Sequence, residues 1–207
     1  MNYNLKTLTT MLVAVTALSA CQTTGEKLTP PSKPMAAAPL PELLTVGDEA
    51  NTVRSDSGVR HYVVTEVDNP WFTVKVNKET DMVLNRNFLT PPKSWGGSNA
   101  NSARVVSGDP DALFPLAVGN TVKFTDAGKT KRASWNGTGN TCTVKGTGSI
   151  KVKAGDFDVY IIVCRRGVGR TSSIATHYYA PDPQLVVKYK KTGFLARSWE
   201  LVSFKRK

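Results

Sequence analysis

The sequence predicts an all-β fold built from antiparallel sheet, with few or no helices. From about residue 46 onward, apolar and polar residues alternate in short runs that are separated by turn residues. Such alternation is typical of antiparallel strands with one buried face. No run beyond residue 46 keeps a helical period of 3.6 for ten residues. A parallel sheet is therefore not expected, because its strands need crossover connections that are usually helices.

The strands can be placed one by one. In Trp71–Asn77, the side chains of Phe72, Val74 and Val76 share one face and polar side chains occupy the other. The same alternation runs through Thr121–Thr125, Ser149–Lys153 and Leu185–Lys190. Further strands are expected at His61–Val67, Met82–Phe88, Asp158–Arg166, Ile174–Tyr179 and Ser198–Phe204.

The segment from Phe88 to Pro115 interrupts this pattern, since it is rich in proline, glycine, serine and asparagine. Loops longer than about 15 residues are usually functional or disordered. Trp95 is the candidate contact residue of this loop. It either closes a cavity mouth or touches a ligand, or it folds back onto the core, which is the interpretation we favour. Pro41–Glu49 and Pro110–Leu116 have room for one helical turn each.

The N-terminus has the features of an export signal. Lys6 precedes an apolar segment, Leu8–Leu18, that is shorter than the about 20 residues of a membrane-spanning helix. Leu18-Ser19-Ala20-Cys21 resembles the lipobox of bacterial lipoproteins at all four positions. The resemblance implies that residues 1–20 are a cleaved signal peptide and that Cys21 is acylated, with palmitate as an expected fatty acid. The alternative is an ordinary secretory signal that happens to be followed by cysteine.

Lipidation also predicts a location. Two or three acyl chains, at about 0.8 kcal/mol per buried CH₂, hold a protein permanently on a membrane. Enteric lipoproteins with aspartate after the cysteine stay in the inner membrane, so Gln22 favours the outer membrane, facing the periplasm, with the inner membrane as the alternative. Residues 21–45 are proline-rich and are expected to form a lipidated tether, with the antiparallel β-domain at residues 46–207.

The chain is basic, with 27 Lys and Arg against 16 Asp and Glu among 207 residues. An exported basic protein meets anionic partners such as lipopolysaccharide, phospholipid headgroups and acidic polymers, whereas nucleic acid is not an expected partner. The candidate residues for an anionic-surface site are Arg165, Arg166, Lys188, Lys190 and Lys191. The other interpretation, which we favour, is that these charges protect sheet edges from pairing and keep the domain soluble.

Two cysteines remain once Cys21 is lipidated, and an oxidising compartment favours a Cys142–Cys164 disulfide. Each lies eleven positions from Lys153, in a segment that is expected to be the turn of a hairpin. The alternation of apolar residues does not match on the two strands. Either the second strand is buried on both faces, or a bulge near Gly146 or Gly148 shifts the phase.

The same hairpin carries a family resemblance. Val144–Tyr160 is similar to a run found in DUF3108-like and TapB-like bacterial envelope proteins, and Leu113–Gly119 and Tyr178–Lys188 are similar to their flanking segments. Lys153 and Gln184 depart from the family, which often has proline and glycine there. The resemblance implies a single antiparallel, strongly curved sheet in the form of a half-barrel or open barrel, and it implies no activity.

No catalytic motif is found, and no cofactor or metal site is expected. The two histidines, His61 and His177, lack metal-binding spacing, and Asp156 with Asp158 is the nearest candidate for a carboxylate pair. We therefore expect a membrane-anchored, periplasmic-facing lipoprotein with a non-catalytic binding or scaffolding role. The alternatives are a carrier that holds a lipid or other apolar ligand in the curved sheet, and a periplasmic hydrolase built around one of the histidines.

Overall fold

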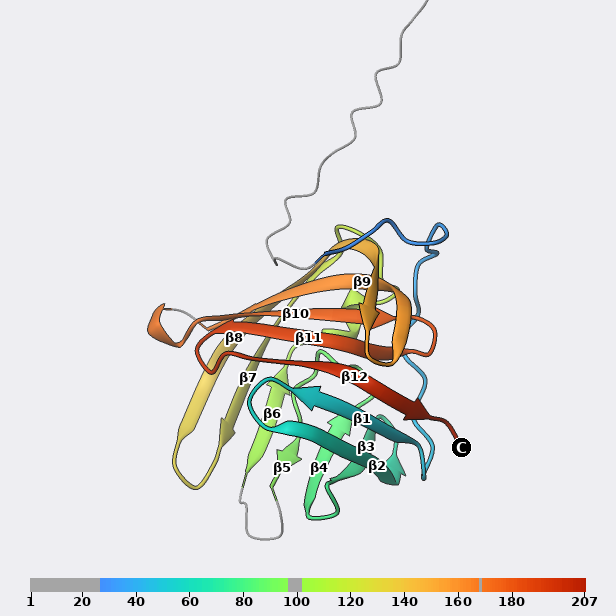
Figure 1. Cartoon of the computed structure of the whole chain (residues 1–207). Coiled ribbons are helices and arrows are strands. Elements are labelled where there is room, and N and C mark those ends of the chain that lie inside the picture. Colours follow the sequence, from blue (N-terminus) through green and yellow to red (C-terminus); the bar gives the residue numbers. More distant parts are fainter. Residues whose placement is uncertain (1–26, 97–101, 168) are drawn as a thin grey trace, which may run out of the picture.

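The computed structural model describes residues 27–96, 102–167 and 169–207. These residues form one antiparallel sheet of twelve strands, which confirms the all-β prediction (Figure 1). Its strands are β1 (Glu49–Arg54), β2 (Gly58–Asp68), β3 (Trp71–Val76), β4 (Thr80–Asn85), β5 (Ser94–Trp95), β6 (Ala103–Ser107), β7 (Thr121–Lys129), β8 (Ser134–Val152), β9 (Gly155–Arg166), β10 (Ser173–Ala180), β11 (Leu185–Gly193) and β12 (Arg197–Lys205). Two short 3₁₀ helices, η1 (Pro110–Leu113) and η2 (Gly169–Thr171), complete the described elements. Within the described residues, no helix has the length and apolar character to cross a membrane.

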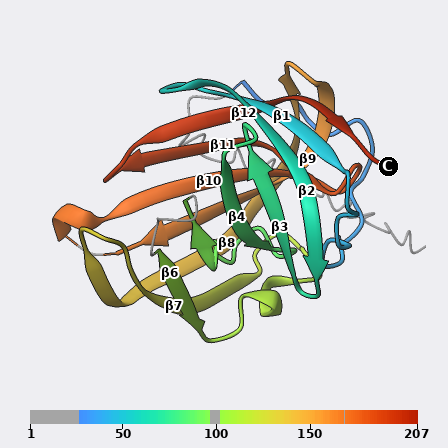
Figure 2. The same ribbon diagram turned by 90° about the horizontal axis from the view of Figure 1, so that it is seen from below.

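The sheet curves until its two edge strands come together. The strand order is β5-β4-β3-β2-β1-β12-β11-β10-β9-β8-β7-β6, so β5 and β6 are the two edges. The backbone N–H of Arg104 in β6 donates to the carbonyl oxygen of Lys93, just before β5, over 2.9 Å. Seen from below, β7 and β8 lie across the molecule from β1 and β12 (Figure 2). The predicted strongly curved, open-barrel form is therefore confirmed.

The hairpin of β8 and β9 agrees with the expected cysteine pairing. Cys142 lies directly opposite Cys164 in the register of the two strands, and their sulfur atoms are bonded. Both explanations for the mismatched alternation hold. A bulge interrupts the register between Val144 and Gly146, and β9 is buried on both faces, since Tyr160 and Val159 belong to different hydrophobic clusters.

Apolar side chains form three clusters. The first fills the concave interior and contains the disulfide, Leu113, Leu116, Tyr160 and Tyr179. The second lies where the tip of the β8–β9 hairpin folds over β10 to β12. The third covers β2 and β3. At about 25 cal/mol per Å² of buried apolar surface, such clusters dominate the stability of the fold.

In the segment from Phe88 to Pro115, the described residues include β5, β6 and η1. The expectation of one long loop was therefore wrong. In β6 the apolar side chain of Val105 is 70% exposed, while the charged side chain of Arg104 shares the inner face with Val106, so the usual alternation is inverted at Arg104 and Val105. Asn87 fixes the start of the segment: its side chain accepts from the Leu89 N–H at 3.0 Å and donates to the Asp111 carboxylate at 2.7 Å. Pro41–Glu49 contains a turn and no helix.

Part of the predicted tether lies against the domain. Thr29 and Ser149 exchange backbone hydrogen bonds, and Ala38 pairs with Leu116 in the same way. Gly148 permits this close approach, since a Cβ there would lie 3.1 Å from the Thr29 carbonyl oxygen. The domain boundaries at residues 20 and 45 remain predictions, but residues 29–38 cover the sheet instead of standing apart from it.

Candidate functional site

Four basic side chains converge at one end of the concave interior. Arg104, Arg166, Lys191 and Arg197 are named the cationic cluster here. Arg166 ends β9 two residues after Cys164, so it shares the core-facing side of that strand. Lys191 lies directly opposite Arg197, the first residue of β12. The cluster thus gathers charges from β6, β9, β11 and β12, of which β11 and β12 are neighbours in the sheet.

Asp126 is the carboxylate at the centre of this end, and it is only 1% exposed. Its oxygens accept from Trp135 Nε1 at 2.8 Å, from Asn140 Nδ2 at 2.9 Å, and from Arg166 Nη2 and Nε at 2.7 and 3.2 Å. Burial alone would raise the pKa of Asp126, but the hydrogen bonds from Arg166, Asn140 and Trp135 outweigh it and leave the pKa below its ordinary value. Asp126 is therefore held as an anion.

Arg104 is the second cation beside Asp126. Its Nε lies 3.5 Å from the Asp126 carboxylate, and its guanidinium lies 4.9 and 5.1 Å from the ring centres of Trp95 and Trp135. This Nε is buried and has no hydrogen-bond partner. Gly128 permits the arrangement, because it pairs with both Arg104 and Trp135 and a Cβ there would collide with the indole ring. The guanidinium thus lies over the rings of two tryptophans, which favours its positive charge.

Lys191 and Arg197 extend the charge toward solvent. Lys191 is half-buried and Arg197 is exposed. Burial lowers the pKa of Lys191, and repulsion from Arg197, Arg166 and Arg104 lowers it further. Burial also lowers the pKa of Arg104; attraction by Asp126 opposes this shift, and repulsion from Arg166 and Arg197 adds to it. The four cations therefore act on one another electrostatically.

Aromatic side chains pack beside the cationic cluster. His177 lies 5.7 Å from Phe88 and 5.0 Å from Tyr189 between ring centres, and Tyr189 stacks on Trp199 at 5.9 Å. Burial lowers the pKa of His177 to about 4, so the ring is neutral at pH 7. The guanidinium of Arg197 lies 6.0 Å from the centre of the Tyr189 ring.

The predicted basic residues do not form one surface. Arg166 and Lys191 face the interior and join the cationic cluster, while Arg165 is exposed on the other face of β9. On β11, alternation places Lys188 and Lys190 on the side opposite Lys191. Lys188 lies 3.9 Å from Glu200 in the neighbouring strand. The candidate anionic-surface site is therefore divided between two faces of the sheet.

Trp95 was the candidate contact residue in the loop. It forms part of β5 and is half-buried. The centre of its ring lies 6.3 Å from that of Trp135, and the guanidinium of Arg104 lies over it. Its ring is thus packed at the cationic end of the interior. Other residues of the site did not emerge from the sequence: Arg104, Asp126, Trp135 and Arg197. The only signal for them was that charged residues occupy core-facing positions of the alternation, which requires knowledge of the strand register.

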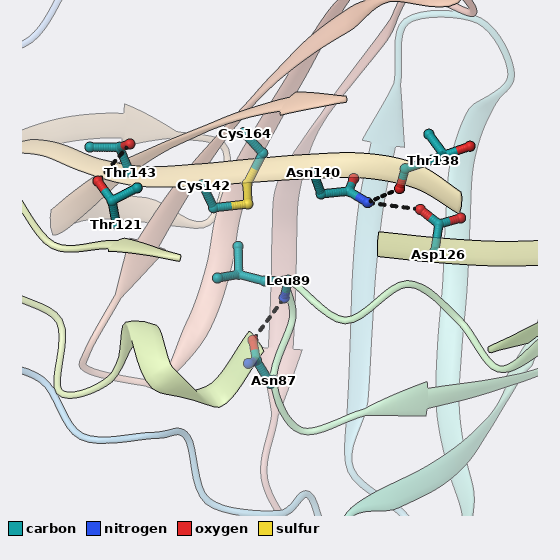
Figure 3. The surroundings of a disulfide bond; sticks show 9 residues. All are labelled: Asn87, Leu89, Thr121, Asp126, Thr138, Asn140, Cys142, Thr143 and Cys164. Carbon is teal, nitrogen blue, oxygen red and sulfur yellow. Dashed lines mark hydrogen bonds between the residues drawn. A yellow bond between two sulfur atoms is a disulfide. The ribbon is translucent and has the colours of Figure 1, made fainter. Parts of the chain in front are cut away.

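The disulfide lies in the same interior. Figure 3 shows Cys142 and Cys164 above Leu89, with Asn140 two residues along β8 and turned toward Asp126. The disulfide thus ties together the two strands that carry Asn140 and Arg166. Cys21 lies outside the described residues.

The candidates for catalysis have other partners. His61 Nδ1 lies 2.9 Å from the Asn51 side-chain oxygen, and His177 contacts aromatic rings. Asp158 accepts hydrogen bonds from Ser32 and Ser149, so it holds the N-terminal segment on the sheet instead of pairing with Asp156. In residues 27–96, 102–167 and 169–207, no group of three His, Cys, Asp or Glu side chains could hold a metal ion.

One pocket is lined by the first three strands and the C-terminal strand, including Leu44, Ala50, Tyr62 and Phe204. Its volume is about 50 Å³. Pockets for small ligands usually have about 300 to 1,000 Å³. This pocket is too small for an acyl chain and gives no support to the carrier hypothesis.

Comparison with solved structures finds the same fold at low sequence identity. The hypothetical lipoprotein YmcC from Escherichia coli K12 matches with a TM-score of 0.55 and 9% identity, over 77% of this chain and 85% of YmcC. A candidate lipoprotein from Parabacteroides distasonis and a candidate exported protein with a YmcC-like fold from Bacteroides fragilis each match with a TM-score of 0.43, at 12% and 13% identity, over 83% of this chain and 100% of theirs. No protein-family model and no curated protein matches the sequence. The class shown by the comparison is therefore an all-β protein with the fold of YmcC.

Proposed function

We propose that the protein is an envelope lipoprotein, anchored through acylated Cys21 to the outer membrane and facing the periplasm. Its β-domain has a non-catalytic role, the binding of an anionic component of the envelope. The lipobox Leu18–Cys21 supports the anchor, and the fold shared with YmcC, described as a hypothetical lipoprotein, agrees with it. The resemblance to DUF3108-like and TapB-like proteins stays a prediction.

The observation that carries the binding role is the surplus of positive charge in the cationic cluster. Arg104 and Arg166 pair with one buried carboxylate, Asp126, and Lys191 and Arg197 add two more positive charges beside them. Like charges that are held together in a partly buried position raise the free energy of the folded chain, and an anion placed among them lowers it. A role in scaffolding alone gives no reason for this surplus.

Metabolic labelling with palmitate tests the anchor. The full-length protein takes up label, and the Cys21→Ala variant takes up none. The double variant Cys142→Ala/Cys164→Ala is the matched control and stays labelled, because its cysteines lie in the domain. Label that remains on the Cys21→Ala variant would contradict lipidation at this residue.

A further inference from the structure

The carboxylate of Asp126 does not accept hydrogen bonds from both of the arginines beside it. Its two oxygens already accept four hydrogen bonds, from Trp135, Asn140 and twice from Arg166. Arg104 is left with a 3.5 Å ion pair and a buried Nε that donates no hydrogen bond. A buried donor without a partner costs about 1–3 kcal/mol. Arg104 therefore has unused capacity for an anionic acceptor.

Lys191 and Arg197 lie close enough to Arg104 for Arg104 to repel Lys191 and for Arg197 to repel Arg104. They are direct neighbours in the register of β11 and β12. In the part of the chain that the structure describes, no carboxylate lies within ion-pair distance of either side chain. Arg197 is exposed, so a ligand reaches this end from solvent. Arg104 thus has only a long ion pair with Asp126, and Lys191 and Arg197 have no counter-charge among the described residues.

We infer that Arg104, Lys191 and Arg197 together bind a terminal phosphate group, as free phosphate or as the phosphomonoester headgroup of a lipid. This inference rests on the proposed function and names the ligand class of the same site. A phosphomonoester carries a charge of about −1.5 to −2 at pH 7 and three acceptor oxygens. That charge balances most of the surplus, and the oxygens supply one acceptor for each cation.

A carboxylate fits the site less well. It brings one negative charge and two oxygens, and Asp126 already supplies such a group to the same end of the interior. Arginine side chains favour planar, two-pronged contacts with phosphate, and Lys191 adds a point charge. The chemistry of Arg104, Lys191 and Arg197 therefore favours the more highly charged group.

Calorimetric titration of the acylated protein in non-ionic detergent tests the inference. The probes are inorganic phosphate, dihexanoyl phosphatidic acid as a lipid-borne phosphomonoester, and polyglutamate as a carboxylate polymer. The test variant is Lys191→Met/Arg197→Gln, which leaves Asp126 and its partners intact. Lys190→Met is the matched control, since it removes the same charge from the opposite face of β11. Thermal unfolding checks that each variant is folded.

Wild type and Lys190→Met are expected to bind inorganic phosphate, phosphatidic acid or both. The double variant is expected to bind the same probe at least about tenfold more weakly, because it loses charged hydrogen bonds. Binding of inorganic phosphate indicates a free anion, and binding of phosphatidic acid alone indicates a lipid headgroup. Equal weakening by Lys190→Met would overturn the inference, because net charge alone would then explain binding. Binding of polyglutamate alone would overturn the inference and leave the proposed function standing. Binding of none of the three probes would overturn both.

Discussion

Replacement of Asp126 by asparagine tests the electrostatic account of the interior. The substitution keeps the shape of the side chain, removes its charge and turns one acceptor oxygen into a donor. Arg166, 2.7 Å away, and Arg104, 3.5 Å away, then lose the one carboxylate between them. Removal of one partner from a buried ion pair costs about 3–5 kcal/mol, because an uncompensated charge stays buried. Domains of this kind are stable by about 5–15 kcal/mol, so a large share of the stability is lost.

Equilibrium unfolding in urea, followed by tryptophan fluorescence, measures this loss, and Trp135 is a local reporter since it donates to Asp126. The matched control is Asp81→Asn. Asp81 pairs with Lys75 at 3.6 Å and both side chains are largely exposed, so this change costs less than about 1 kcal/mol. If Asp126→Asn were no more destabilising than Asp81→Asn, the buried carboxylate would not organise the cationic end.

Three further predictions concern the disulfide, the buried histidine and the N-terminal segment. The Cys142→Ser/Cys164→Ser variant should lose about 3 kcal/mol of unfolding free energy in the chain-entropy model for a 22-residue separation, and equal urea midpoints for wild type with and without reductant would contradict this. The pKa of His177 is about 4 in the folded protein and 6.5 when the ring is exposed, so unfolding takes up a proton between these pH values. The free energy of unfolding should therefore fall as the pH drops from 6.5 to 4. This part of the pH dependence should be absent from the His177→Gln variant. Ala38→Glu, at a buried position, should cost more than about 2 kcal/mol, while Ala37→Glu at the exposed neighbour should be silent; equal effects would mean that this segment is a free tether.

The sequence was most informative where the signal is local. The β8–β9 hairpin was predicted because its alternation, its turn and its two cysteines all lie within a short stretch, and the structure confirms the pairing. A bulge near Gly146 or Gly148 was one of two explanations of the phase mismatch, and the sequence did not decide between the two positions; the structure has it between Val144 and Gly146. Its position depends on how the hairpin tip packs over β10 to β12, which is a contact between distant segments.

The cationic end was largely missed for a physical reason. Arg104 and Asp126 occupy positions where a core-facing strand normally carries apolar residues, so each breaks the pattern from which strands are recognised. Trp135 lies among asparagine, glycine and threonine, outside every strand that the sequence predicts. Arg197 meets Lys191 only because β12 follows β11 in the sheet. Contacts between charged side chains on different strands cannot be identified before the pairing of the strands is known.

The most direct test of the envelope assignment is the intact mass of the protein isolated from its own membranes. We expect a chain that begins at Cys21 and carries the added mass of two or three acyl chains. A chain that begins at Met1, or one that lacks any fatty-acyl mass, would contradict it.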